Sequence, residues 1–436
     1  MDEKKKSFHF GWVIFIACCC YCAGSITLTM SIAGVFLPHL AEHSGLNIAE
    51  AAMWLTVMGP VSTIASPVWG HLMPVVKDIR WLTLPLALCQ VLASIVFANA
   101  TSMTTVIIAG VLVGLSLSYM FGMLPATLMG NWFDERVRGR FMGIAFAFTG
   151  LGTFVFAPTM AKLIMTIGLS NAYYVAAGIA FVLLVPITFF IRFTPEQKGV
   201  LPFGYVEGVS NENTKDFSGL TLKQSLATVA FWALIVMYIG LSCLNGFNSM
   251  MPEFANEFLA GTMSAEDLAM FGASLVSIGA VGNICSKLVF GFLADKLGIN
   301  ATMYVFNGII IVSFLLWYFF DFTYTLAIGA FLYGFSNASV SIGLPMYTQE
   351  IFGLKDFPAI FAWTGIPAQF INGSTATVIG MIFLSTGSYK MAMFFGVGLV
   401  LLCVVGMLVV QPTIKKLRAR WDTSKPEEAE TEVAAA

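Results

Sequence analysis

The sequence predicts an all-α polytopic membrane protein with twelve transmembrane helices arranged as two six-helix halves. Of its 436 residues, 58% are hydrophobic and only 11% are charged, whereas a soluble domain carries about 25% charged residues. Apolar runs of about 20 residues, enough to cross a bilayer at 1.5 Å per residue, recur along the chain. Only helices and closed barrels satisfy their backbone hydrogen bonds in lipid, and barrel strands would give short alternating segments instead.

Twelve apolar segments define the expected helices, and they are 10–36, 50–73, 81–98, 104–129, 141–165, 171–191, 227–250, 268–291, 302–320, 325–348, 358–384 and 389–411. The first of them follows a basic stretch but lacks a small-residue cleavage site, so we expect a retained helix and not a signal peptide. All eight cysteines lie in these segments, and "CCCYC" (18–22) lacks the paired spacing of a metal site. Packing is therefore the expected role of the cysteines.

The positive charges are distributed unevenly. If the helices alternate in direction, all but three of the 22 Lys and Arg residues fall on one side of the membrane. The opposite loops (37–49, 97–103, 251–267 and 321–324) contain none. Cytoplasmic loops carry an excess of Lys and Arg, so both termini and the central loop are expected in the cytoplasm. The three exceptions are Lys162 and Lys390, near outer helix ends where a lysine reaches the headgroups, and Lys287.

The two halves of the chain resemble each other. Trp12 and Trp232 are 220 residues apart, as are Pro125 and Pro345, and a polar linker separates the two sets. We expect an N-terminal half at 1–191, a cytoplasmic linker at 192–226, a C-terminal half at 227–411 and a disordered tail at 412–436. Parallel repeats of this kind are typical of secondary transporters.

Two motifs resemble those of a known family. "GFLADKLG" (291–298) resembles the Gly-x-Leu-x-Asp-x-x-Gly loop of the major facilitator superfamily, with Gly291, Asp295 and Gly298 in place. Its first-half counterpart, "GHLMPVVKDIR" (70–80), has Pro74 where the family has an acid. The stretch 130–158, which includes Arg138, is similar to the oxalate:formate antiporter and monocarboxylate transporter branch. The resemblance implies that Arg138 and the loop motif act in gating, and that the two halves alternate access to a substrate.

Lys287 is the main candidate for substrate binding. It lies eight residues, about 12 Å along a helix, before Asp295, and an ammonium at that depth costs about 2.5–3.5 kcal/mol. Either the charge faces a wet cavity or an anion, or the stem carries it to the inner headgroups. In the resembled branch, a cation eight residues before the loop aspartate pairs with the substrate carboxylate. Lysine would serve there as a point charge, without the bidentate fork of arginine.

The other binding candidates lie on the expected helices that the resemblance assigns to the cavity, and on the eleventh. They are Tyr21, Tyr119, Asn245, Asn248, Asn337, Trp363 and Gln369. The amides are the better candidates because a buried amide needs external partners. In the eleventh helix, "FAWTGIPAQF" (361–370) offers no second cation for a dicarboxylate, so a monocarboxylate is the expected substrate class.

Together these patterns predict a secondary active transporter for a small organic anion, multi-pass in the cytoplasmic membrane and monomeric. No cofactor, metal or nucleic-acid partner is expected, and the coupled species is a proton or a counter-anion. The alternative is an exporter of drugs or hydrophobic compounds, which the 39 Phe and 23 Met residues would suit. An enzyme is not expected, because the four histidines have no metal-ligand spacing on a helix.

Overall fold

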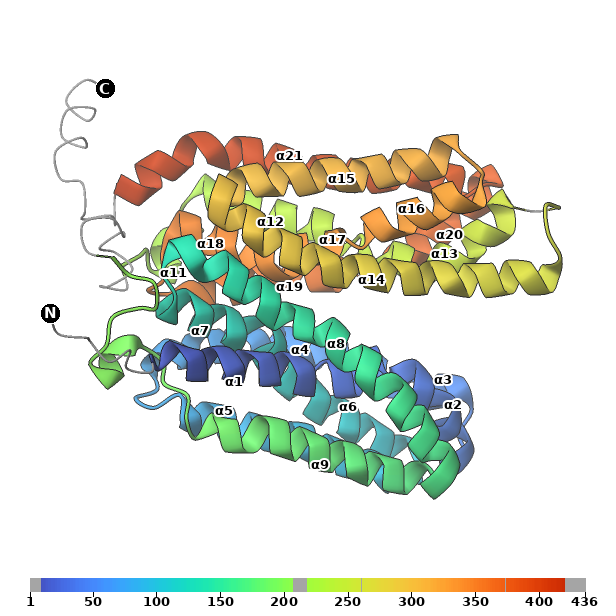
Figure 1. The fold of residues 1–436 in the computed structure, drawn as a ribbon, viewed down its shortest axis with the longest axis horizontal. Coiled ribbons are helices and arrows are strands. Elements are labelled where there is room, and N and C mark those ends of the chain that lie inside the picture. Colours follow the sequence, from blue (N-terminus) through green and yellow to red (C-terminus); the bar gives the residue numbers. More distant parts are fainter. Residues whose placement is uncertain (1–8, 207–217, 260, 373, 420–436) are drawn as a thin grey trace, which may run out of the picture. The chain divides into compact units, whose positions relative to one another are not determined.

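The computed structural model describes residues 9–206, 218–259, 261–372 and 374–419. The chain divides into two compact units, Met1–Ser218 and Gly219–Ala436. Each unit is a bundle of long helices, coloured blue to green and yellow to red in Figure 1. Because lipid offers no hydrogen-bond partners, helices that satisfy their own backbone groups are the expected building element for so apolar a chain.

The described part of the first unit contains nine α-helices, two π-helical turns and one 3₁₀ turn. In chain order they are α1 (Gly11–Gly24), η1 (Thr27–Ser31), α2 (Ala33–Ser44), α3 (Ile48–Ala51), α4 (Met53–Val75), α5 (Arg80–Ala98), α6 (Met103–Leu117), η2 (Ser118–Met123), α7 (Leu124–Trp132), α8 (Glu135–Ile167), α9 (Leu169–Thr188) and the 3₁₀ turn η3 (Pro195–Lys198). Within this unit α5 packs against both α6 and α9, and α1 packs against α8.

The second unit has the same kind of construction. Its helices are α11 (Leu222–Leu226), α12 (Val229–Ser242), α13 (Asn245–Phe258), α14 (Ala265–Leu297), α15 (Ile299–Phe319), α16 (Thr323–Tyr333), α17 (Ser336–Ala338), η4 (Ser339–Gly343), α18 (Leu344–Phe352), α19 (Phe357–Asn372), α20 (Thr375–Thr386) and α21 (Lys390–Ala419). Here α12 packs against α21 and α19, while α14 packs against α13 and α16.

Ten helices among the described residues are long and apolar enough to cross a membrane. Two of the twelve predicted segments fall outside this group. The segment 50–73 forms α4, a 23-residue helix that contains three prolines. The segment 358–384 divides into α19 and α20, each shorter than a full span. All-α architecture in a multi-pass membrane protein is confirmed, and the two exceptions are helical as predicted.

Two predicted boundaries differ from the structure. The first apolar segment continues through α2 to Ser44, where Gly45 ends the helix at a left-handed φ of 67°. The last helix continues to Ala419, so residues 412–419, expected in the tail, are helical. Ile414 and Leu417 are buried in that extension, and Arg418 pairs with Glu350 at 3.0 Å. Residues 420–436 lie outside the described part of the chain.

Two segments form backbone hydrogen bonds with a neighbouring loop. One follows α9 in the first unit, and the other precedes α11 in the second unit. In the first unit the backbone N–H of Phe203 donates to Trp132 O at 2.7 Å, and Asp134 N donates to Phe203 O at 3.0 Å. In the second unit, Leu220 N donates to Phe352 O at 2.8 Å. A Cβ on Gly219 would lie 2.7 Å from Phe352 O, so this close approach requires glycine.

Candidate functional site

Four membrane-spanning stretches carry a backbone irregularity near the middle. In two of them the Leu124 N–H bonds to Tyr119 O and the Leu344 N–H bonds to Ser339 O, each five residues back. The cause is local, because Pro125 and Pro345 have no N–H with which to continue the ordinary ladder. π-Helical turns of this kind are frequent at functional sites.

The other two stretches are η1 and the junction of α12 with α13. Ser31 N bonds to Ile26 O, five residues back, at 3.1 Å. Between α12 and α13 the backbone hydrogen bonds change to the 3₁₀ pattern, because the Leu244 N–H bonds to Leu241 O, three residues back. These four stretches are the first, fourth, seventh and tenth of the twelve predicted spans. They are the ones that the sequence resemblance assigned to the transport cavity.

Lys287 is only 4% exposed and lies on α14, ten residues before the helix ends at Leu297. It is therefore not at a surface where the ammonium could reach water at the helix end. The preceding residue, Ser286, is fully buried and donates a hydrogen bond to Asn283 O at 2.8 Å. The structure thus holds a cation within a membrane-spanning helix of the second unit, where the desolvation cost is high.

Two contacts of α14, one on each side of Lys287, show what packs against this part of the helix. Along the helix, Ser286 contacts Gly334 O at 3.4 Å. Farther along, the ring of Phe290 lies 3.0 Å from the position a Cβ would take on Gly343. Lys287 lies between these two contacts along α14, on the part of the helix that packs against α17 and η4.

Among the described residues, two buried polar atoms on α14 and on η4, which packs against it, lack a hydrogen-bond partner. Ser339 Oγ is buried without a hydrogen-bond partner, and so is Asn283 Oδ1, one helical turn before Lys287. Buried polar atoms left unpaired are uncommon and costly. Asn283 was not among the residues predicted from sequence, although its spacing of four from Lys287 on a helix could have indicated it.

The predicted amides of the second unit are accessible. Asn245 and Asn248 on α13 and Gln369 on α19 are exposed, and Asn337 on α17 is half-buried. Trp363 on α19 is 46% exposed. An exposed amide midway along a membrane span is costly against hydrocarbon, so a wet surface is its favourable environment.

The two predicted tyrosines of the first unit are fully buried, and their hydroxyls are engaged within that unit. Tyr21 shares a 2.9 Å hydrogen bond with Thr188 of α9. Tyr119 shares a 2.8 Å hydrogen bond with Thr83 of α5. Both contacts tie a π-interrupted span to an outer helix of the same bundle.

The loop-motif residues lie at the end of α14. Gly291 is buried, Asp295 is half-buried, and Gly298 joins α14 to α15 with a φ of 79°. This left-handed conformation favours glycine over any residue with a Cβ. In the first unit Arg138 is 6% exposed near the start of α8, and its Nε donates to Phe133 O at 3.4 Å.

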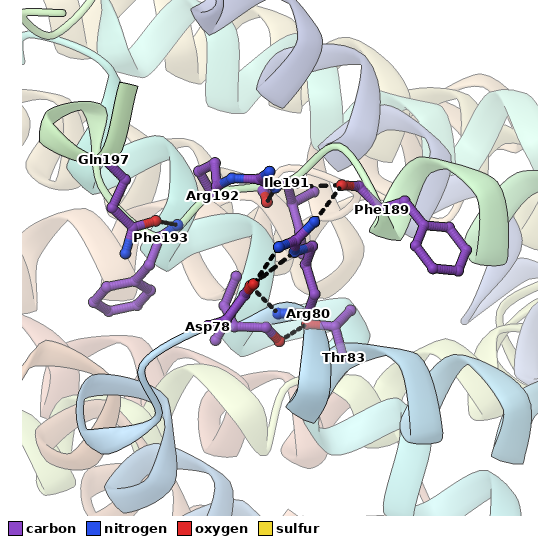
Figure 2. A network of polar contacts seen from close by, with 9 residues as sticks. Asp78, Arg80, Thr83, Phe189, Ile191, Arg192, Phe193 and Gln197 are labelled. Carbon is purple, nitrogen blue, oxygen red and sulfur yellow. Dashed lines mark hydrogen bonds and ion pairs between the residues drawn. The ribbon is translucent and has the colours of Figure 1, made fainter. Parts of the chain in front are cut away.

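The first unit has an acid near the degenerate copy of the motif, four residues after Pro74. Figure 2 shows Asp78 held by Arg80, whose Nε lies 2.8 Å and 2.9 Å from the two carboxylate oxygens. These hydrogen bonds lower the pKa of the Asp78 carboxyl, and the nearby charge of Arg192 adds to the effect. Sequence comparison with the motif missed this pair because Asp78 does not occupy the motif's acidic position.

The family model of the Major Facilitator Superfamily matches residues 14–340 of the chain. The chain belongs to this superfamily. Monocarboxylate transporter 12 of Xenopus laevis is 26% identical over 192 residues, covering 41% of this chain. An uncharacterized MFS-type transporter of Escherichia coli, YhjX, is 28% identical over 189 residues, covering 43% of this chain. The aligned regions span 40% and 43% of the lengths of these relatives.

Solved structures share the fold across nearly the whole chain. The fucose:proton symporter FucP of E. coli matches with a TM-score of 0.68 at 12% identity, covering 92% of this chain and 99% of that one. The human organic anion transporter MFSD10 matches with a TM-score of 0.66 at 14% identity, with the same two coverages. At such low identity these likenesses establish the fold and leave the solute open. Membership of a transporter superfamily agrees with the prediction of transport.

Proposed function

We propose that this superfamily member is a secondary active transporter of a small organic anion, and that its substrate is a monocarboxylate. The observation that carries the proposal is the buried cation Lys287, 4% exposed within a membrane-spanning helix. A bound carboxylate would offset the desolvation of the ammonium, as a paired charge does in a low-dielectric site. The name of the Xenopus relative, a monocarboxylate transporter, agrees with this substrate class.

Two side chains with buried polar atoms, one on α14 and one on the η4 turn that packs against it, suit a carboxylate. The Ser339 hydroxyl supplies a hydrogen-bond donor, and the Asn283 amide supplies donors when its NH₂ faces the substrate. A single cation favours one carboxylate over two. Asn245, Asn248, Asn337, Trp363 and Gln369 remain proposed contacts for the rest of the solute, and Tyr21 and Tyr119 remain in the proposed set through their rings. Asp295, Gly291, Gly298 and Arg138 remain the proposed gating residues.

The proposed membrane is the cytoplasmic membrane, with both termini inside. In the first unit, hydrogen bonds bring three Lys- and Arg-containing segments to one end of the bundle. Arg80 Nη1 donates to Phe189 O at 3.4 Å, and Trp132 Nε1 donates to Arg192 O at 2.8 Å. A concentration of positive loops at one end agrees with the cytoplasmic assignment of that end.

Counterflow in proteoliposomes tests the proposal. Labelled formate, acetate, lactate, pyruvate, an aromatic acid and oxalate would be offered to wild type, Lys287→Gln and the matched control Lys162→Gln. We expect exchange of one monocarboxylate class, lost in Lys287→Gln and kept in the control. Repeating the exchange with and without a pH gradient distinguishes a coupled proton from a counter-anion. Exchange of oxalate but of no monocarboxylate would contradict the proposed substrate class.

An exporter of hydrophobic compounds is the second candidate, and one observation favours it. The first unit contains a mostly apolar cavity lined by Leu28, Phe36, Leu37, Leu40, Trp54, Phe97 and Tyr173, with Thr29 and Ser94. Aromatic and aliphatic linings are typical of sites for apolar ligands, although this cavity, at about 10 Å³, has room for about one water molecule and would have to widen to admit such a compound. Under this alternative no labelled acid would exchange, and a hydrophobic dye would be moved equally well by wild type and Lys287→Gln.

A further inference from the structure

Exposed apolar side chains lie along both α5 and α9 in the first unit. Three exposed residues of α5 are spaced seven and four apart, so they share one face: Trp81 at 75%, Leu88 at 38% and Leu92 at 48%. On α9 the exposed residues Tyr174, Phe181 and Val182 form a similar face, and Phe189 continues it just beyond the helix end. Because α5 and α9 pack side by side, these faces form one surface suited to lipid chains.

Two guanidinium groups lie where this apolar surface ends. Arg80, next to Trp81, holds Asp78 and reaches Phe189 O at 3.4 Å (Figure 2). Arg192 places Nη1 2.7 Å from Ile191 O and 3.2 Å from Phe189 O. Among the described residues its Nε and Nη2 have no hydrogen-bond partner. One edge of the Arg192 fork is therefore available to an acceptor.

The end of the α5 and α9 pair that carries Arg80 and Arg192 is positively charged. Arg80 pairs with the carboxylate of Asp78, the charge of Arg192 also acts on it, and the neighbouring Lys77 is exposed and adds a further positive charge. The ring of Trp81, which is 75% exposed, is of the kind that sits at the headgroup level of a bilayer. A positive group at this level attracts anionic headgroups.

The second unit shows that the fold itself does not require this cluster. α5 begins at Arg80 and α15, the corresponding helix of the second unit, begins at Ile299, so the two helix starts can be aligned. In that alignment Ile299 and Asn300 stand where the first unit has Arg80 and Trp81. The guanidinium and the indole are thus features of the first unit alone at this position.

We propose that Lys77, Arg80, Trp81 and Arg192 form a binding site for the phosphate of an anionic phospholipid. The Arg192 fork donates hydrogen bonds to the phosphate oxygens, and the acyl chains lie along the exposed faces of α5 and α9. Asp78 keeps Arg80 in place and lowers the positive charge of the site. The proposal does not depend on the identity of the transported solute.

Native mass spectrometry of the full chain in detergent tests the site. Phosphatidylglycerol and phosphatidylcholine with identical acyl chains would be titrated onto the delipidated protein. We expect a preference for phosphatidylglycerol, weakened about fivefold in Arg192→Gln, the effect of one basic residue at a membrane surface. Arg192→Lys keeps the charge and should bind phosphatidylglycerol more tightly than Arg192→Gln. Lys296→Gln, which removes an exposed charge in the second unit, is the matched control and should bind like wild type.

Asp78→Asn gives a test of opposite sign. Because it removes the negative charge, it should tighten phosphatidylglycerol binding, whereas a merely structural role of the cluster would predict weaker binding. Inorganic phosphate at millimolar concentration should leave the bound lipid in place, since it lacks acyl chains. Equal binding of the two lipids, unchanged binding in Arg192→Gln, or displacement by phosphate would overturn the proposal. So would a dimer peak that replaces the lipid adducts, because it would assign the surface to a second copy of the chain.

Discussion

The packing of α14 against α16 is tight enough to give a quantitative prediction. A Cβ on Gly282 would lie 2.0 Å from Phe331 O and 2.9 Å from Phe331 C. Both are backbone atoms, so no side chain can rotate away, and Gly282→Ala must separate the two helices by about 1 Å. Overpacking of this kind costs about 1–3 kcal/mol, partly offset by up to about 1 kcal/mol from the better helix propensity of alanine.

The expected net loss is about 1–2 kcal/mol, or roughly 2–8 °C in the midpoint of thermal unfolding of the second unit, Gly219–Ala436. The assay is a thermal melt of purified protein in detergent. Gly308→Ala is the matched control, because Gly308 lies in α15 and a Cβ there meets nothing within 4 Å. Its midpoint should equal or exceed that of wild type. If Gly282→Ala melted at the same temperature as Gly308→Ala, the close contact between α14 and α16 would be refuted.

Two further predictions concern the first unit. Arg80 lowers the pKa of Asp78, so the pair contributes stability that is present above the carboxyl's ordinary pKa, near 3.8, and is lost as pH falls through the lowered value. The difference in melting midpoint between wild type and Asp78→Asn should therefore be constant from pH 7 to about pH 5 and shrink in more acid solution. A difference that grew on acidification would contradict the pairing. Tyr119→Phe removes the hydrogen bond to Thr83 and should lower the free energy of unfolding by about 1 kcal/mol. Its counterflow KM should stay within about twofold of wild type, since the hydroxyl is already engaged; a large rise in KM would instead make that hydroxyl a substrate contact.

Composition and periodicity were sufficient to predict the helical spans, because the bilayer requires runs of about 20 apolar residues and such runs can be recognised in the sequence. Proline marked where two of these spans would deviate, since Leu124–Pro125 and Leu344–Pro345 each follow a π-helical turn. The continuation of the first span to Ser44 was not predicted. Glycine at position 45, followed by the Asn47–Glu50 capping box of α3, is the local signal for that boundary.

Side-chain partners could not be read from the sequence in the same way. Tyr21 and Thr188 are 167 residues apart, and nothing local in either segment indicates their hydrogen bond. The same holds for the packing of α14, which carries Lys287, against η4, which begins at Ser339. Asp78 was missed for a different reason, because a pair formed at the start of α5 replaces the acid expected at Pro74.

The most direct test of the central claim is counterflow by Lys287→Gln beside Lys287→Arg, with Lys162→Gln as the control. If Lys287 is the counter-charge for the substrate, Lys287→Gln should bind the exchanged monocarboxylate about 30-fold more weakly or worse. Lys287→Arg should keep part of the exchange, because it keeps the charge. Exchange by a folded Lys287→Gln protein at the wild-type affinity would contradict the account and leave the buried lysine without a role in binding.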